Sequence, residues 1–183
     1  MKKVLILIII ILILAAIGFW FWRSKKAITF PDIVPMDTFT IESSAFKNNS
    51  NIPSKYTCDG ENINPPLSIS GVPENTQSLV LVVEDPDAPM GTFTHWTIWN
   101  ISSQTTEIPE NSVLTGATEG KTDFGRVGWG GPCPPSGTHR YFFKLYALDT
   151  KLDLVGGASK TELEKAMEGH ILAGAELIGL YSR

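Results

Sequence analysis

The sequence predicts an all-β domain with minor α content: an antiparallel, Greek-key-type β-sandwich with a short helix near the C-terminus, preceded by an N-terminal transmembrane helix. First, most apolar or alternating segments are short and lie between glycine and proline turns, which is typical of strands. Second, a single late segment carries the signals that begin and end a helix. Third, nineteen residues near the start contain no charge, enough to span a bilayer as a helix.

The strand predictions rest on periodicity and on flanking turn residues. Ser78–Glu84 is largely apolar, which favours a buried central strand. The polar stretch Asn48–Ser54, which contains a proline, predicts a loop. The Gly- and Pro-rich stretch Glu107–Gly137 is unusually long for a compact domain, and such segments are usually functional. The predicted strands are Thr38–Ser44, Leu67–Ile69, Ser78–Glu84, Thr94–Ile101 and Arg140–Leu148.

One short helix is predicted over Lys160–Glu168. Ser159 is its candidate N-cap, Glu162 follows three residues later, and Gly169 is a stop signal. The final segment, Ile171–Tyr181, fits either a strand or a helix on its residues alone. A chain of mostly strands with one late helix is all-β or α+β, and a sandwich is the favoured architecture.

The first 26 residues differ in kind from the rest. Two lysines precede the uncharged run Val4–Trp22, and three basic residues follow it. We predict a membrane anchor or signal segment over 1–26, a linker over 27–37 and a folded domain over 38–183. An uncleaved single-pass anchor is favoured over a cleaved signal peptide, whose apolar region is usually only about 7–15 residues long. Basic residues flank both ends of the run, so the charge rule for orientation is nearly balanced. An extracytoplasmic domain is favoured because such a segment doubles as an export signal, and the reverse orientation stays open.

Charge separates along the chain and narrows the classes of partner. The first 26 residues carry five basic and no acidic residues, which leaves 10 basic against 19 acidic residues in the remainder. So acidic a domain argues against nucleic acid as a partner and against lying flat on an anionic lipid surface. An anion pocket within it needs local hydrogen bonds that act against the overall field.

Two stiff loops hold the candidate binding residues. Asp85–Pro89 follows one predicted strand, and Gly130–Tyr141 leads into another. Because proline fixes the backbone and glycine allows close approach, loops of this composition are shaped in advance. They place Asp, His and Tyr side chains at strand ends, which predicts one small polar pocket.

Alternation along a strand predicts which side chains share a face. His95 and Trp99 are expected to point to one face of their strand, and His139 and Tyr141 share a face of theirs. If the two strands are neighbours, His95, His139 and Tyr141 converge at one end of the sheet, where Asp85 joins them. A buried histidine satisfied by backbone hydrogen bonds is the alternative for each of the two histidines.

These residue types suit an anion such as phosphate, whose oxygens accept hydrogen bonds. Histidine and tyrosine offer N–H and O–H donors. The turn at Gly130 and Gly131 offers backbone N–H groups for an anion nest. A carboxylate such as Asp85 orients a histidine by accepting from its second ring nitrogen.

Several polar and aromatic residues also have a plain structural interpretation. Asp85 and Asp87 suit the side-chain hydrogen bonds of a turn. Arg140 faces away from the neighbouring histidine and is expected to form a structural ion pair. His170 is expected to be a surface residue at a helix end. Trp129 fits a pocket wall or simple loop packing, and the sequence does not decide between them.

Together these motifs resemble a known family. The loop Asp85–Pro89, the histidine within the tryptophan-rich strand Thr94–Asn100 and the stretch Gly130–Leu148 are similar to the phosphatidylethanolamine-binding protein family. The similarity is closest to its bacterial and archaeal branch, often labelled Raf-kinase-inhibitor-like. Tyr56–Leu67 and Gly169–Tyr181 also resemble that branch, so the resemblance extends over nearly the whole predicted domain.

The resemblance implies a small pocket for phosphate-like head groups, with an aromatic residue, Phe93, at its mouth. It favours a strand for the final segment, and the C-terminal helix of eukaryotic members has no evident counterpart after Tyr181. It also makes proximity of Cys58 and Cys133 plausible, whereas their spacing alone leaves open a disulfide or two separate buried residues. The resulting ligand-binding set is Asp85, Asp87, Pro89, His95, Gly130, Gly131, Pro132, His139 and Tyr141.

We therefore predict a membrane-tethered binding module with an anion pocket for a phosphate-containing ligand, such as a lipid head group or a phosphorylated group. Modulation of a partner protein is a further expectation. The alternative is an inhibitor or scaffold that acts on a kinase or protease mainly through its surface, as the family label implies. A small hydrolase is less favoured because HExxH, GxSxG and P-loop motifs are absent from the sequence. No catalytic residue, metal or cofactor is predicted.

Overall fold

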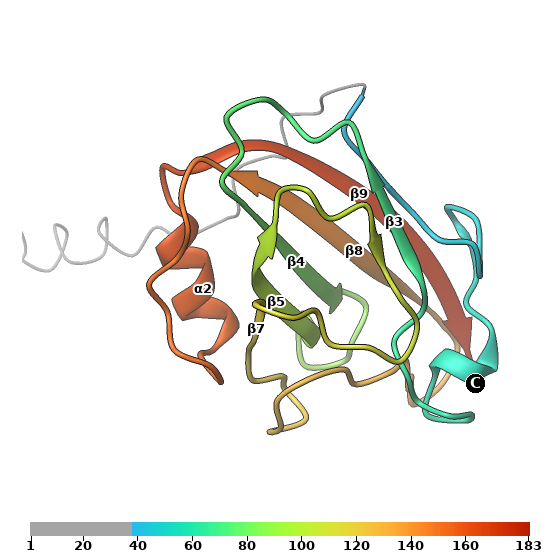
Figure 1. Cartoon of the computed structure of the whole chain (residues 1–183). Coiled ribbons are helices and arrows are strands. Elements are labelled where there is room, and N and C mark those ends of the chain that lie inside the picture. Colours follow the sequence, from blue (N-terminus) through green and yellow to red (C-terminus); the bar gives the residue numbers. More distant parts are fainter. Residues whose placement is uncertain (1–37) are drawn as a thin grey trace, which may run out of the picture. The chain divides into compact units, whose positions relative to one another are not determined.

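The computed structural model describes residues 38–183, which form two β-sheets and a short α-helix (Figure 1). The predicted anchor or signal segment, residues 1–26, and the predicted linker, residues 27–37, lie outside the described residues. Among the residues that are described, no helix has the length and apolar character needed to cross a membrane.

The larger sheet contains the predicted central strands. β4 (Ser78–Asp85) pairs antiparallel with β5 (Phe93–Ser102) on one side and with β8 (Thr138–Leu148) on the other. β9 (Ile171–Ser182) extends the sheet beyond β8, and β7 (Thr118–Glu119) pairs with the far side of β5. Since β8 returns beside β4 after β5 and β7, the spatial order β8-β4-β5-β7 follows that of a Greek key.

The smaller sheet contains β1 (Thr40–Glu42), β3 (Leu67–Ser70) and β6 (Glu107–Ile108), in the order β1-β3-β6. Alternate residues of both sheets enter a shared hydrophobic core, so the two sheets form a β-sandwich. The core includes Ile41, Leu67, Ile69 and Ile108 from the smaller sheet, and Leu81, Val83, Trp96, Ile98, Phe143 and Leu145 from the larger.

The helix α2 (Lys160–Met167) packs beside the larger sheet, as Figure 1 shows, and buries the side chains of Leu163 and Met167. Glu84 of β4 is buried and holds the ammonium groups of Lys144, at 2.6 Å, and Lys160, at 2.8 Å. Because Lys144 belongs to the sheet and Lys160 to the helix, one buried carboxylate ties the helix to the sheet.

The predicted helix is confirmed, with an end one residue earlier than expected. The hydroxyl of Ser159 accepts from the backbone N–H of Glu162 at 3.3 Å, and the carboxylate of Glu162 accepts from the backbone N–H of Ser159 at 2.8 Å. This reciprocal capping box satisfies two N-terminal donors of the helix. Gly169 adopts φ 80°, a left-handed conformation that ends helices and that glycine accepts without strain.

All five predicted strands are present, with ends that differ by up to two residues. The final segment is strand β9, as the family resemblance implied. The prediction of a loop throughout Asn48–Ser54 is wrong, because β2 (Ser50–Asn51) pairs with β9. This pair is parallel, so the larger sheet is not wholly antiparallel as predicted. The long stretch Glu107–Gly137 contains β6 and β7 and otherwise forms loops.

Candidate functional site

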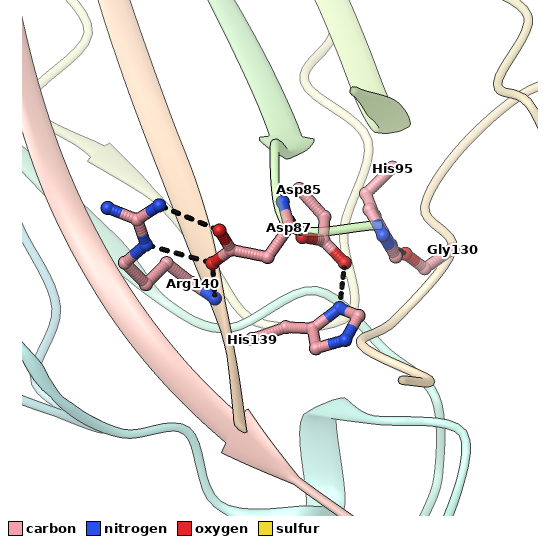
Figure 2. A network of polar contacts seen from close by, with 6 residues as sticks. All are labelled: Asp85, Asp87, His95, Gly130, His139 and Arg140. Atoms are coloured by element: carbon pink, nitrogen blue, oxygen red, sulfur yellow. Dashed lines mark hydrogen bonds and ion pairs between the residues drawn. The ribbon is translucent and has the colours of Figure 1, made fainter. Parts of the chain in front are cut away.

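Asp85 and His139 form a buried pair where β4 ends and β8 begins. Nδ1 of His139 lies 2.7 Å from Oδ2 of Asp85, and the two side chains are 9% and 4% exposed, respectively (Figure 2). Because a carboxylate accepts hydrogen bonds, Nδ1 carries the hydrogen, which leaves Nε2 of His139 for another partner. Oδ1 of Asp85 accepts from the backbone N–H of Asp87 at 2.8 Å. Asp85 therefore both orients a histidine and closes the turn, so both interpretations of this residue are confirmed.

His95 reaches the same cluster through a β-bulge. The pairing of β4 with β5 shifts between Val83 and Glu84, which leaves His95 as the extra residue of β5. The imidazole centroid of His95 lies 5.1 Å from the ring centroid of Tyr141, a side chain of the inter-sheet core. The prediction that His95 shares a face with Trp99 is therefore wrong, because a bulge interrupts alternation and re-aims a side chain.

The imidazole of His95 is fixed by a backbone carbonyl. Its Nδ1 lies 2.6 Å from the oxygen of Gly130, and the N–H of Gly130 donates in return to the carbonyl of His95 at 3.0 Å. Since a carbonyl oxygen only accepts, Nδ1 carries the hydrogen and Nε2 is left for another partner. Burial lowers the pKa of His95, and this effect exceeds the opposing effects of the Gly130 bond and the Asp85 charge. His95 is therefore neutral at neutral pH.

Tyr141 contributes a buried hydroxyl beside the two histidines. Burial and the nearby charge of Asp85 raise the pKa of Tyr141, so the phenol keeps its proton. The hydroxyl is buried, and no acceptor for its hydrogen lies within reach among residues 38–183. A buried donor without an acceptor is costly, so this group is suited to a ligand that accepts a hydrogen bond.

Two phenylalanines cover the cluster beside His95. The ring centroid of Phe93 lies 5.2 Å from that of His95, consistent with the mouth position that the family resemblance implied. The ring of Phe124 lies edge-on to His95 at 5.3 Å and is 42% exposed as a residue. Sequence reasoning missed Phe124, because the long loop that contains it has no periodicity from which its direction could be predicted.

The backbone N–H groups of Gly130 and Gly131 are already bonded within the protein. Gly130 donates to the carbonyl of His95 at 3.0 Å, and Gly131 donates to Oδ1 of Asn62 at 2.8 Å. The prediction that they form an anion nest is therefore wrong. A Cβ added at Gly131 would lie 2.5 Å from the carbonyl oxygen of Tyr56, so glycine is needed here for close backbone approach.

A disulfide fixes the loop that precedes His139. Cys58 and Cys133 are bonded, with Cα atoms 5.4 Å apart, which decides the question that the sequence left open. The backbone N–H of Cys58 also donates to the carbonyl of the predicted site residue Pro132 at 3.1 Å. Pro132 is buried within this anchored loop. The loop is thus held by one covalent bond and by backbone hydrogen bonds.

Asp87 forms an ion pair at the edge of the cluster. Its two oxygens accept from Nε and Nη2 of Arg140 at 2.8 and 2.7 Å, and the backbone N–H of Arg140 donates to it at 3.0 Å (Figure 2). These hydrogen bonds lower the pKa of Asp87 to about 2. The structural ion pair predicted for Arg140 is confirmed, and Asp87 directs its carboxylate to Arg140.

Substituting Asp87→Asn should lower the free energy of unfolding by about 0.2–1 kcal/mol at neutral pH, the range typical of exposed ion pairs. The pKa of Asp87 is lower in the folded protein than in the unfolded chain. Its stabilising contribution is therefore present above about pH 4 and is lost as the pH falls through the folded value. Urea denaturation at pH 7 and at pH 2 checks this; an equal difference between wild type and variant at both pH values would contradict it.

The remaining candidates occupy separate places. Pro89 is exposed in the turn after β4. His170 is exposed and bonds Asp149 at 2.8 Å, which confirms a surface position. Trp129 stacks on Phe143 and also lines a cavity, so both interpretations of this residue hold. In the described part of the chain, no three His, Cys, Asp or Glu residues are grouped so that they could hold a metal ion.

Fold and site together define a disulfide-bonded β-sandwich domain with two fixed histidines, an aspartate and a tyrosine at one end of the larger sheet. A model of the family described as phosphatidylethanolamine-binding protein matches residues 42–182. The chain belongs to this family.

Relatives and solved structures place the chain in the bacterial and archaeal branch. It is 57% identical over 150 residues to a UPF0098 protein of Pyrococcus horikoshii, covering 77% of this chain and 75% of the relative. A UPF0098 protein of Aquifex aeolicus is 52% identical over 148 residues, covering 77% and 86% of the respective chains. A crystal structure of a phosphatidylethanolamine-binding protein homologue from Chlamydia trachomatis is 42% identical, with a TM-score of 0.78, over 81% of this chain and 99% of that one. Escherichia coli YbcL is 34% identical, with a TM-score of 0.75, over 79% and 98%.

Proposed function

We propose that the domain binds a phosphate group of a small molecule, a lipid head group or a phosphorylated side chain through His95, His139 and Tyr141. The observation that carries the proposal is the shared state of the two histidines. Each uses Nδ1 on a protein acceptor, Gly130 O at 2.6 Å or Asp85 Oδ2 at 2.7 Å, which leaves Nε2 for a ligand. The unassigned hydroxyl hydrogen of Tyr141 supplies a donor beside them, and each Nε2 donates to the anion when its imidazole is protonated.

Several features support an anion over a neutral ligand. A protonated histidine is a donor at both ring nitrogens, and a charged donor makes shorter and stronger hydrogen bonds to phosphate oxygens than a neutral one. Asp85 orients the imidazole of His139 through Nδ1, so Nε2 is the ring nitrogen left to face a ligand. The family description, phosphatidylethanolamine-binding protein, is consistent with a phosphate-bearing ligand.

We further propose that residues 1–26 tether the domain to a membrane with the domain on the extracytoplasmic side. The uncharged run of nineteen residues supports the tether. The disulfide between Cys58 and Cys133 supports the location, because disulfides persist mainly in oxidising compartments. A protein partner, such as a kinase or protease, belongs to the same proposal as a second binding function.

The pH dependence of anion binding tests the proposed role of His95. The pKa of this residue lies below its ordinary value of about 6.5, so anion binding to the imidazolium form must take up a proton. Affinity for sulfate should therefore rise as the pH falls below 7, by up to about tenfold per pH unit, the limit for one coupled proton. Sulfate is the sharper probe, since phosphate itself titrates in this range.

Isothermal titration calorimetry of sulfate and phosphate between pH 5 and 8 measures this dependence. Without an anion, the stability of the domain should change with pH in the opposite direction to sulfate affinity: it should decrease as the pH falls. A folded pKa below the unfolded value gives a contribution that is present above about pH 6.5 and is lost as the pH falls through the folded pKa. Added anion should restore stability at low pH. Sulfate affinity that stays flat over this range would mean that neutral donors alone bind the anion.

A further inference from the structure

A cavity lies apart from the cluster of His95, His139 and Tyr141. Its volume is about 190 Å³. It is lined by two loop segments, Asn62–Asn64 and Asn111–Val113, by the core tryptophan of β5, and by Glu119, Gly128 and Trp129. None of the proposed phosphate-binding side chains lines it.

Glu119 is the one charged residue among those that line the cavity, which include no lysine, arginine or histidine. Its Oε1 accepts from Nε1 of Trp96 at 2.7 Å, which fixes the carboxylate and leaves lone pairs on Oε2 for a ligand. A Cβ at Gly128 would lie 3.6 Å from both carboxylate oxygens. The missing side chain at this position, where φ is +90°, therefore keeps the carboxylate accessible.

Aromatic rings form the other chemical component of the wall. The rings of Trp96 and Trp129 lie perpendicular, with centroids 5.7 Å apart, and both residues line the cavity beside Glu119. Tryptophan rings attract cations through their electron-rich faces, and indole is the strongest side chain in this role. A carboxylate next to two tryptophans, with no basic residue in the lining, favours a ligand with a cationic group.

We propose that this cavity binds a small primary alkylammonium ion. The ammonium group donates to Oε2 of Glu119, and the alkyl part packs against Trp96 and Trp129. A primary ammonium fits better than a quaternary one because a carboxylate oxygen needs an N–H donor. The volume of about 190 Å³ is comparable to that of an apolar cavity of roughly 150 Å³ that accommodates benzene, which suits a chain of a few carbons.

n-Butylammonium is a suitable probe for the full chain. Its binding should be saturable by calorimetry and should shift the indole N–H resonance of Trp96, which bonds the carboxylate directly. 1-Butanol has nearly the same shape without charge, and butyrate has the opposite charge. Both should bind at least about tenfold more weakly, the factor expected for one charge-assisted hydrogen bond. Equal binding of 1-butanol and n-butylammonium would overturn the proposal.

Glu119→Gln and Glu107→Gln form a matched pair of variants. The first keeps an oxygen acceptor for Trp96 and removes the charge from the cavity, whereas the second removes an equal charge from an exposed position in β6. The proposal requires a loss of about tenfold or more in n-butylammonium affinity for the first and no change for the second. Retained affinity in Glu119→Gln, an equal loss in both variants, or displacement by inorganic phosphate would each overturn it.

Discussion

Replacing His139 with alanine should abolish measurable phosphate binding while the domain remains folded. The substitution removes one of the two Nε2 groups proposed to contact the anion, and it leaves Oδ2 of Asp85 without its bond of 2.7 Å. Loss of a hydrogen bond to a charged group corresponds to about 1.5–3 kcal/mol, or at least tenfold in affinity. Because Asp85 is only 3% exposed, we also expect a loss of about 1–3 kcal/mol in unfolding free energy from its unsatisfied oxygen.

His170→Ala is the matched control for this experiment. His170 also bonds a carboxylate, Asp149, through Nδ1 at 2.8 Å, but its side chain is 45% exposed and lies outside the cluster. Calorimetry with phosphate and urea denaturation should therefore show neither effect in this variant. If the His139 and His170 variants bound phosphate equally well, the proposed site would be wrong.

Removing the disulfide should produce the second large effect. Cys58 and Cys133 close a loop across 75 residues of sequence. A covalent link over so long a loop restricts the unfolded chain, and such links typically contribute about 2–4 kcal/mol of stability. The double variant Cys58→Ser, Cys133→Ser should therefore unfold at lower urea concentration. Phosphate affinity should also decrease, because Pro132 and the following loop lose one of their anchors.

Chemical reduction of the wild-type protein provides the comparison. Wild type treated with a reductant should unfold like the double variant, whereas the double variant itself should not respond to the reductant. The backbone bond from Cys58 to Pro132 and the bond from Gly131 to Asn62 remain in both cases, so partial retention of affinity is expected. An unfolding midpoint that is the same with and without the disulfide would contradict this account.

The fold was predictable where segments are long and strongly patterned. Ser78–Asp85 is buried along its whole length, and its apolar sequence indicates this directly. The strands β2, β6 and β7 contain only two residues each, too few to show any periodicity. Their existence depends on partners distant in sequence, such as β9 for β2, which local patterns do not encode.

The parts of the site that follow from residue types within a motif were predictable from the sequence. The parts that depend on backbone geometry were less so. The pairing of Asp85 with a histidine followed from two residue types at strand ends, and it is present. The direction of the His95 side chain depends on a β-bulge, and no nearby residue in the sequence indicates that bulge. The donors of Gly130 and Gly131 are used by His95 and Asn62, which sequence spacing does not place near them.

The most direct test of the central claim is a phosphate titration followed through the ring resonances of the three histidines by NMR. The account predicts saturable shifts at His95 and His139 with a common dissociation constant, and no shift at His170, whose carboxylate partner and exposure place it elsewhere. Absence of a shift at His95 and His139 at saturating phosphate would contradict an anion site. Recognition of a partner protein through the surface of the domain would then be the favoured function.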